Sequence, residues 1–100
     1  MLVRVGAATD VAEGAMRAYD VDGTPVAVAN VGGQLFAFDD TCTHAACSLA
    51  EGELSGTTVT CLCHFSQFDV TSGAVLGGPA DEPVRSHAVS VEEGSLLIES

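Results

Sequence analysis

The chain has 100 residues, 47% of them hydrophobic, with 14 acidic side chains against three arginines and no lysine, giving a formal net charge of −11. A chain of this length suits one small domain that buries roughly 60 to 70% of the surface its unfolded form exposes, and the hydrophobic content argues against disorder. Its anionic field repels phosphate backbones and anionic membranes, and no window approaches the ~18 apolar residues of a membrane span, so we expect neither nucleic-acid nor membrane binding.

Short runs rich in Val, Thr and Phe recur between Gly, Asp and Asn clusters, which is the pattern of a small all-β domain. Segment 8–15 has an acidic residue, Asp10, near its start and allows a helical turn that Gly14 cuts short. Asp22-Gly23 and Gly32-Gly33 separate strand-like runs and supply the positive φ of tight hairpin turns, and residues 92–94 mark another turn. The predicted strands are, in chain order, residues 2–5, 16–21, 25–31, 34–38, 57–61, 65–70, 87–91 and 95–98.

The stretch from about residue 39 to about residue 83 differs from its flanks. It contains every cysteine, most of the later glycines, and Pro79. We interpret it as a loop-rich subdomain inserted into a β base of residues 1–38 and 84–100, within a single domain of residues 1–100. The first residues, MLVRVGAATDVAEGA, contain neither an apolar h-region nor a twin arginine, so we expect a soluble, full-length, cytoplasmic protein.

All four cysteines and two of the three histidines lie in two short stretches, CTHAAC at 42–47 and CLCHFSQFD at 61–69. One residue separates Cys42 from His44, and two separate Cys61 from His64. Two cysteines and two histidines can bind one zinc ion tetrahedrally, or hold a 2Fe-2S cluster with both cysteines on one iron and both histidines on the other. Zinc ribbons and fingers usually open with two cysteines, whereas each clip here mixes the ligand types.

A C-x-H clip followed by a C-x2-H clip resembles the Rieske ferredoxins, as do the boxes CTHAACSLAEGEL and CLCHFSQFDVTSGAVL, the proline loop GGPADEPV and the last strands SHAVSVEEGSLLIES. The resemblance implies a Rieske-like small antiparallel β domain with a loop-rich cluster-binding subdomain. It also implies one 2Fe-2S cluster per chain, with Cys42 and Cys61 on the buried iron and His44 and His64 on the outer iron. Neutral imidazole in place of thiolate raises the potential above that of an all-cysteine cluster.

The remaining cysteines, Cys47 and Cys63, match a pair that forms a disulfide in respiratory and photosynthetic Rieske proteins, and the resemblance implies the same bridge here. The dioxygenase-type ferredoxins that this short chain otherwise resembles generally lack the pair, and the alternative is two buried thiols, since cytosolic disulfides are uncommon.

Ser66 lies where high-potential members place a hydroxyl donor to a bridging sulfide, while Phe68 replaces a tyrosine donor. Pro79 belongs to the loop that packs over the cluster. We expect a potential between the family's extremes.

Phe65 stands where glycine more often follows the ligand histidine. Because phenylalanine tolerates positive φ poorly, we expect a rearranged loop there.

Exposed apolar residues beside the ligands are expected to form a docking rim, although shielding the cluster from water explains them equally well. His87 is interpreted as a surface or half-buried residue outside the ligand set, and Asp69 as a maker of local turn hydrogen bonds. The expected rim consists of Ala45, Ala46, Leu62 and Phe65.

By this resemblance the chain is expected to be a monomeric one-electron carrier between a flavin-containing reductase and a terminal oxygenase, such as an aromatic-ring hydroxylating dioxygenase. It is not expected to be an enzyme itself, because 100 residues without a mononuclear iron motif leave no room for a catalytic domain. Two alternatives stay open. One is a higher-potential Rieske subunit or redox sensor, suggested by the extra cysteine pair, and the other is a zinc-binding structural module, which metal and sulfide analysis would distinguish.

Overall fold

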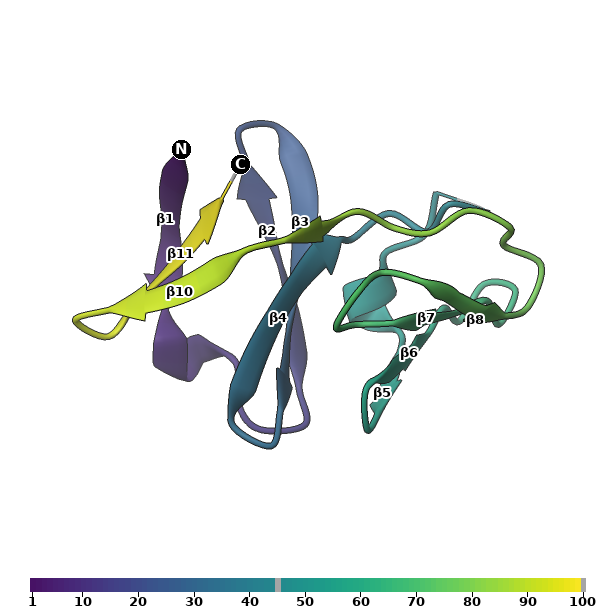
Figure 1. The fold of residues 1–100 in the computed structure, drawn as a ribbon, viewed down its shortest axis with the longest axis horizontal. Helices are drawn as coiled ribbons and strands as arrows, with labels where there is room; N and C mark the ends of the chain where they lie inside the picture. The colour runs from purple at the N-terminus through teal and green to yellow at the C-terminus, as the bar shows by residue number, and fades with distance from the viewer. Residues whose placement is uncertain (45, 100) are drawn as a thin grey trace.

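Within residues 1–44 and 46–99, which the computed structural model describes, the strands form three antiparallel sheets. Two of them make a β base that carries the first and the last described residues, and the third, β5 to β8, lies at the other end of a molecule measuring 39 × 27 × 19 Å (Figure 1). The predicted all-β fold is confirmed. The elongated shape places the cysteine-rich segment at the end opposite the second base sheet, β1, β11 and β10 (Figure 1).

The first base sheet has the order β2-β3-β4-β9. The turns predicted at Asp22-Gly23 and Gly32-Gly33 connect its first three strands, with φ of 52° and 86° in one and 60° and 94° in the other. Positive φ at both central residues gives the twist that suits a two-residue hairpin. The strands are β2 (Met16–Val21), β3 (Thr24–Val31), β4 (Gln34–Asp39) and β9 (Ser86–His87).

The second base sheet has the order β1-β11-β10, and a third turn, at Glu93 and Gly94, joins its last two strands. The single strand predicted over residues 87–91 is wrong. His87 pairs with Ala37 in the first sheet, whereas Val89 pairs with Ile98 in the second, because the chain crosses from one sheet to the other at the corner between them. The strands are β1 (Leu2–Ala7), β10 (Val89–Glu92) and β11 (Ser95–Glu99).

The third sheet, β5-β6-β7-β8, lies inside the segment predicted to be loop-rich. The two strands predicted there are shorter than expected, and β5 and β8 were not predicted. Short helical turns occur at Ala8–Asp10 (η1), inside the segment expected to hold one, and at Leu49–Glu51 (η2). No helix in the described part of the chain is long and apolar enough to cross a membrane. The strands are β5 (Glu53–Ser55), β6 (Thr58–Thr60), β7 (Gln67–Asp69) and β8 (Val75–Gly77).

Strand β3 belongs to two hydrophobic cores at once. Successive side chains of a strand point to opposite faces of the sheet, so Val26 and Val28 pack with Leu96 and Ile98 between the base sheets. Ala27 and Ala29 belong to the other core, which extends into the cysteine-rich segment. The base therefore supports that segment directly through side-chain packing. The second core also contains Phe38, Cys42, Leu49, Val59, Cys61, Phe68, Val70, Ala80 and Val84.

Candidate metal centre

The first cysteine-bearing loop, residues 40–48, begins where β4 ends. The N–H of Cys42 donates to the carbonyl oxygen of Cys47 at 3.0 Å, which folds the loop back on itself. Asp40 is buried, and it fixes the start of the loop to η2: its backbone carbonyl accepts the N–H of Leu49 at 2.7 Å, and its carboxylate accepts the N–H of Ala50 at 2.8 Å. Both ends of the loop are therefore anchored.

The second loop, residues 61–66, connects β6 to β7. The N–H of Cys61 donates to the carbonyl oxygen of Ser66 at 2.8 Å, and the N–H of Phe65 donates back to the carbonyl oxygen of Cys61 at 2.9 Å. These two bonds close a tight turn on the end of a strand pair. The residues between them, which include His64, are held at the tip.

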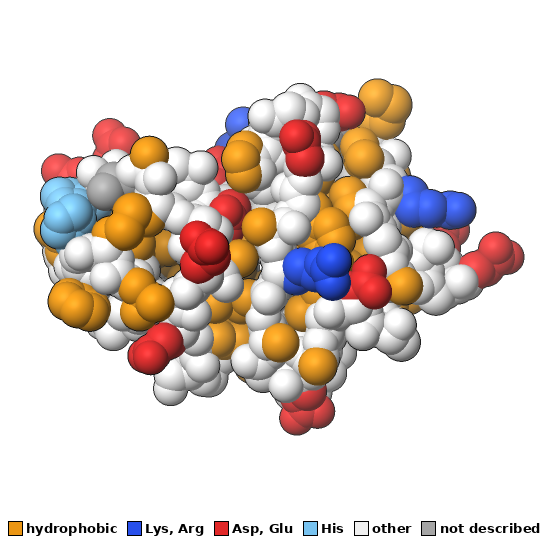
Figure 2. All heavy atoms as spheres, turned by 180° about the vertical axis from the view of Figure 1, so that it is seen from behind, with side chains coloured by type: hydrophobic (Ala, Val, Ile, Leu, Met, Phe, Trp, Pro, Cys, Tyr) orange, Lys and Arg blue, Asp and Glu red, His pale blue; other side chains and the backbone are white. Residues whose placement is uncertain are grey.

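The four predicted ligands divide into an inner and an outer pair. Cys42 and Cys61 are only 3% and 1% exposed and belong to the second core. His44 and His64 are exposed, and their rings lie 4.8 Å apart between centroids in an edge-to-face arrangement. Figure 2 shows histidine side chains grouped at one end of the molecule with hydrophobic side chains beside them. The fold thus brings together the histidines of two loops that are twenty residues apart in sequence.

A disulfide joins Cys47 of the first loop to Cys63 of the second, as the extra pair of cysteines predicted. The sulfur atoms of Cys47, Cys61 and Cys63 all lie within 4.8 Å of one another. Disulfide sulfurs offer no thiolate, so Cys61 alone of these three can bind a metal in this state. The crosslink closes a segment with a sequence separation of 16, which in the chain-entropy description stabilises the fold by ~3 kcal/mol.

The donor set fits the groups that the sequence suggested. Thiolates and imidazoles are ligands for zinc and for iron in iron–sulfur clusters, and Cys42 and Cys61 both lie outside the disulfide. Their apolar surroundings, Leu49, Val59 and Phe68, exclude water from the sulfur side, while the imidazoles lie at the surface. This division into a dry thiol side and an exposed imidazole side suits a centre with two unlike metal positions.

A third segment, the proline loop of residues 77–84, packs against the second loop. Ser66 is fully buried, and its hydroxyl oxygen accepts the N–H of Ala80 at 3.2 Å. Gly78 has a φ of 84°, and a Cβ there would lie 2.5 Å from Cα of Ser66 and 2.7 Å from the carbonyl oxygen of Phe65. Pro79 is exposed. Glycine is thus required at 78, both by its conformation and by this close approach.

Phe65 adopts a φ of 63°, in the left-handed region. The expected rearrangement of the backbone around phenylalanine is therefore wrong: the loop keeps a conformation typical of glycine and the bulky residue accepts the strain, of roughly 1–3 kcal/mol. The ring is 67% exposed. Because the ring is not buried, packing in the core does not explain why a strained phenylalanine stands at this position. We therefore assign Phe65 a role at the surface.

The residues expected to form a docking rim are exposed wherever the structure describes them. Leu62 is 52% exposed, and Ala46 is also at the surface. Ala45, the remaining member, lies outside the described residues. Phe68, in contrast, is fully buried in the second core and has no hydroxyl with which to donate a hydrogen bond.

Asp69, at the end of β7, makes the local turn hydrogen bonds expected from the sequence. One carboxylate oxygen accepts the Thr71 hydroxyl at 2.6 Å and the Thr71 N–H at 2.8 Å. These bonds, the hydroxyl bond first, lower the pKa of Asp69 from its ordinary value. The role of this residue is therefore to shape the turn that follows the second loop.

Sequence reasoning missed a pairing between His87 and Asp39. Nε2 of His87 lies 2.7 Å from a carboxylate oxygen of Asp39, the last residue of β4, and Nδ1 lies 3.3 Å from the carbonyl oxygen of Glu99. The His87 side chain is only 5% exposed. No spacing rule relates positions 48 residues apart, so only the fold reveals this contact. His87 lies in the base, as expected of a residue outside the ligand set.

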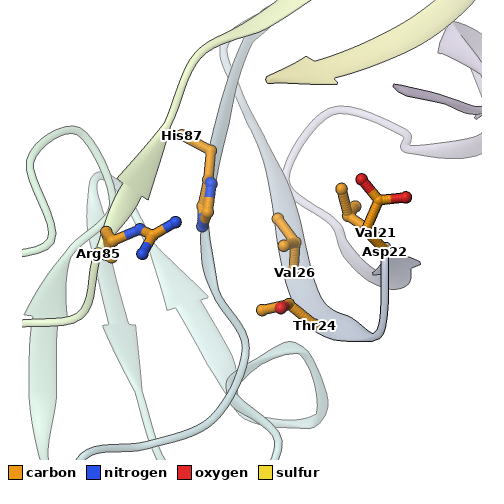
Figure 3. A pocket seen from close by; sticks show the side chains of 6 residues that line it. All are labelled: Val21, Asp22, Thr24, Val26, Arg85 and His87. Carbon is orange, nitrogen blue, oxygen red and sulfur yellow. The ribbon is translucent and has the colours of Figure 1, made fainter. Parts of the chain in front are cut away.

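His87 also lines a cavity of about 270 Å³ in the β base. Figure 3 shows Arg85 and His87 on one wall and residues of the β2–β3 hairpin on the other. None of the four predicted ligands lines this cavity, so it does not belong to the metal centre. Its lining residues are Val21, Asp22, Thr24, Val26, Arg85 and His87.

Comparison with known proteins identifies the family. Residues 1–88 match the sequence profile of the Rieske [2Fe-2S] domain. The chain belongs to the Rieske family. The cofactor of this Rieske protein is one 2Fe-2S cluster of the Rieske type, and the buried thiols and exposed imidazoles described above fit it.

Two relatives of known function match the Rieske chain over almost its whole length. The ferredoxin component of the p-cumate 2,3-dioxygenase system of Pseudomonas putida is 40% identical over 100 residues, covering 98% of this chain and 85% of that protein. The ferredoxin component of biphenyl 2,3-dioxygenase of Rhodococcus jostii (strain RHA1) is 36% identical over 98 residues, covering 98% and 92%. A chain in the solved complex of reduced oxygenase and oxidized ferredoxin in carbazole 1,9a-dioxygenase is 37% identical, with a TM-score of 0.91 and coverage of 97% and 91%.

Proposed function

We propose that this Rieske protein is a one-electron carrier that takes electrons from a flavin-containing reductase and delivers them to a terminal oxygenase, such as an aromatic-ring hydroxylating dioxygenase. The observation that carries the proposal is a pair of exposed imidazoles in contact at one end of the molecule, on the same two loops that carry two buried cysteines (Figure 2). The relatives named as ferredoxin components of dioxygenase systems support it. The proposal places a monomer in the cytoplasm, where it would meet both partners.

Within this proposal, residues of about 39–83 form the cluster-binding part of a single domain. Cys42 and Cys61 would bind the buried iron, and His44 and His64 the outer iron. When bound, the cluster supplies a reversible one-electron centre with a potential in the range of roughly −150 to +300 mV. The protein's own contribution is to exclude water from the thiol side and to expose the imidazole edges to a partner.

The surroundings of the imidazoles favour brief contact with another protein. Leu62 and Phe65 are large apolar side chains that are more than half exposed, and Ala46, also exposed, lines the same surface cavity as Leu62. Exposed apolar groups of this kind mark interaction sites. With a formal net charge of −11, the carrier would be steered toward basic surfaces on its partners. Together these features would bring a partner's redox centre within a short path of His44 or His64.

Reconstituted electron flow tests this proposal. The purified protein, a flavin-containing ferredoxin reductase and the oxygenase of the p-cumate or biphenyl system should together couple oxidation of a reduced nicotinamide cofactor to formation of the oxygenated product. Omission of the carrier should abolish product formation. The controls are His44→Ala and His64→Ala, which should fail to restore flow. If a protein with an intact and reducible cluster accepts electrons from no reductase, the carrier function is wrong.

The disulfide supports a second candidate, a higher-potential Rieske subunit or redox sensor. The Cys47–Cys63 bridge is present in the structure, and it matches a feature of the respiratory-type proteins that the sequence also resembles. A midpoint potential well above zero together with no electron flow to an oxygenase would favour this candidate. One zinc and no acid-labile sulfide per chain would instead favour a structural zinc module.

A further inference from the structure

The Cys47–Cys63 disulfide, which electron transfer does not use, is open to solvent. Cys63 is exposed and Cys47 is half-buried, and both line a surface cavity of about 390 Å³. We propose that this disulfide is a thiol-exchange site, at which an external protein dithiol opens the crosslink and thereby loosens the two loops that hold the cluster. The other residues lining the cavity are Ala46, Ser48, Glu51 and Leu62.

The difference in exposure between the two sulfur-bearing residues determines the direction of the exchange. Attack by a thiolate depends on access to the sulfur, and Cys63 is the more exposed residue. The dithiol's thiolate bonds to Sγ of Cys63, and the Cys47–Cys63 bond breaks with its electron pair on Cys47, which takes up a proton. The second thiol of the dithiol then attacks the dithiol sulfur that is bonded to Cys63. The mixed disulfide breaks, and Cys63 is released as a thiol. The dithiol is oxidised to a disulfide, and the protein disulfide is reduced to two thiols.

The consequence follows from the position of the crosslink. It joins two loops that each carry one cysteine and one histidine of the proposed ligand set, and the sulfurs of Cys47 and Cys63 lie within 4.8 Å of that of Cys61. Reduction therefore removes a covalent tie between the loops and creates two new thiols close enough to compete with Cys61 for iron. This consequence rests on the proposed ligand set, whereas the exchange reaction does not.

Charge restricts which thiols can react. Glu51 is the charged residue on the cavity wall, and the chain as a whole has a formal charge of −11. An anionic thiolate such as that of glutathione is repelled by this field, and the repulsion weakens as salt rises. The surface therefore fits a dithiol protein whose reactive cysteine lies among neutral or basic residues.

Alkylation of the holoprotein tests the exchange without reference to electron transfer. The oxidised holoprotein is treated anaerobically with dithiothreitol and iodoacetamide, without denaturant, and the labelled peptides are mapped by mass spectrometry. We expect labels on Cys47 and Cys63 while the visible spectrum of the cluster persists. Labels that appear only after the cluster is lost, or only in denaturant, would overturn the proposal.

Trapping experiments test the direction and the charge selectivity. A dithiol protein lacking its second cysteine should form a mixed disulfide on Cys63, and an adduct on Cys47 would contradict the assigned direction. At low salt the cationic thiol cysteamine should react faster than glutathione. Glu51→Gln should raise the glutathione rate by about twofold, whereas Glu53→Gln, the control on β5 outside the cavity lining, should leave it unchanged. Equal effects of the two substitutions would exclude a local role for Glu51.

The loosening of the loops has its own readout. The double variant C47S/C63S mimics the reduced state without supplying competing thiols, so its cluster absorbance should decay several-fold faster than that of the oxidised wild type. Dithiothreitol-treated wild type should decay faster still, because its two thiols compete for iron. If the double variant and the treated wild type both retain the cluster as long as the oxidised wild type does, reduction does not loosen the loops. If Cys47 and Cys63 are labelled but the cluster does not decay faster, the thiol exchange occurs and only the loosening of the loops is wrong.

Discussion

The buried hydroxyl oxygen of Ser66 accepts a hydrogen bond from the N–H of Ala80 at 3.2 Å, which joins the second loop to the proline loop. The oxygen acts as the acceptor in this bond, so the hydroxyl proton is available to another partner. Position 66 lies two residues beyond His64. A proton donor placed in this way is suited to stabilise the added negative charge of a reduced cluster.

Replacing Ser66 by alanine should therefore lower the midpoint potential. A hydrogen bond to a charged group is worth about 1.5–3 kcal/mol, which for a one-electron couple corresponds to roughly 65–130 mV. Protein-film voltammetry at pH 7 measures the shift. Ser90→Ala, on exposed strand β10, is the control and should leave the potential unchanged. An equal potential in the wild type and Ser66→Ala would show that the hydroxyl does not donate to the cluster.

Gly78→Ala should destabilise the protein more than Gly33→Ala. Both glycines have positive φ, at 84° and 94°, but only at Gly78 does an added Cβ meet the backbone of Phe65 and Ser66. The conformational cost alone is about 1–2 kcal/mol, and the clash at Gly78 adds displacement of the proline loop. Urea unfolding of the two variants measures the difference. Equal losses in the free energy of unfolding would mean that the proline loop moves to accommodate the added Cβ without destabilising the protein.

The variant Phe65→Asn tests separately the backbone strain at position 65 and the contribution of the Phe65 ring to recognition of the oxygenase. Asparagine accepts the left-handed conformation more readily than phenylalanine, so this variant should be up to about 1 kcal/mol more stable than the wild type. It should also transfer electrons to the oxygenase more slowly, because a large apolar group is lost from the rim. Leu62→Asn is the matched control, since Leu62 is exposed and has no positive φ: it should slow transfer without adding stability. Unchanged electron transfer in both variants would show that the apolar rim does not contribute to recognition of the oxygenase.

The turn at Asp69 should contribute stability that depends on pH. A carboxyl whose pKa is lowered by folding stabilises the native state above its unfolded pKa of about 3.9, and that contribution is lost as pH falls through the folded pKa. Thr71→Val removes the hydroxyl donor, so it should unfold at lower urea than the wild type at pH 7, by at most about 1 kcal/mol, and the gap should narrow below about pH 4. Thr71→Ser should behave as the wild type. A gap that stays constant between pH 7 and pH 3 would show that the bond does not act through the charge of Asp69.

The hairpins and the site-bearing loops could be predicted because local chemistry determines them. Asp22-Gly23 and Gly32-Gly33 adopt the positive φ that their residue types favour. The two cysteine–histidine clips predict a shared metal centre, and the contact between the rings of His44 and His64 agrees with that prediction. The pairing of Cys47 with Cys63 needed the family resemblance as well, because sequence alone does not determine disulfide connectivity.

The remaining features depend on tertiary context. Strand β5, with the sequence ELS, has only Leu54 partly buried between two exposed residues, so it gives almost no hydrophobic pattern until it pairs with β6. The switch between sheets after His87 and the contact of His87 with Asp39 join segments far apart in sequence. Phe65 contradicts a local rule about positive φ, and such contradictions are expected at functional sites, where tertiary contacts impose the backbone conformation.

A potentiometric titration of the purified protein, followed by electron paramagnetic resonance, tests both the histidine ligation and the electron-carrier function, with iron and sulfide analysis of the same sample. We expect two irons and two acid-labile sulfides per chain, and a single one-electron transition with a midpoint potential within roughly −150 to +300 mV. A midpoint near that of all-cysteine clusters, about −400 mV, would contradict histidine ligation. Zinc with no redox transition would contradict the electron-carrier account altogether.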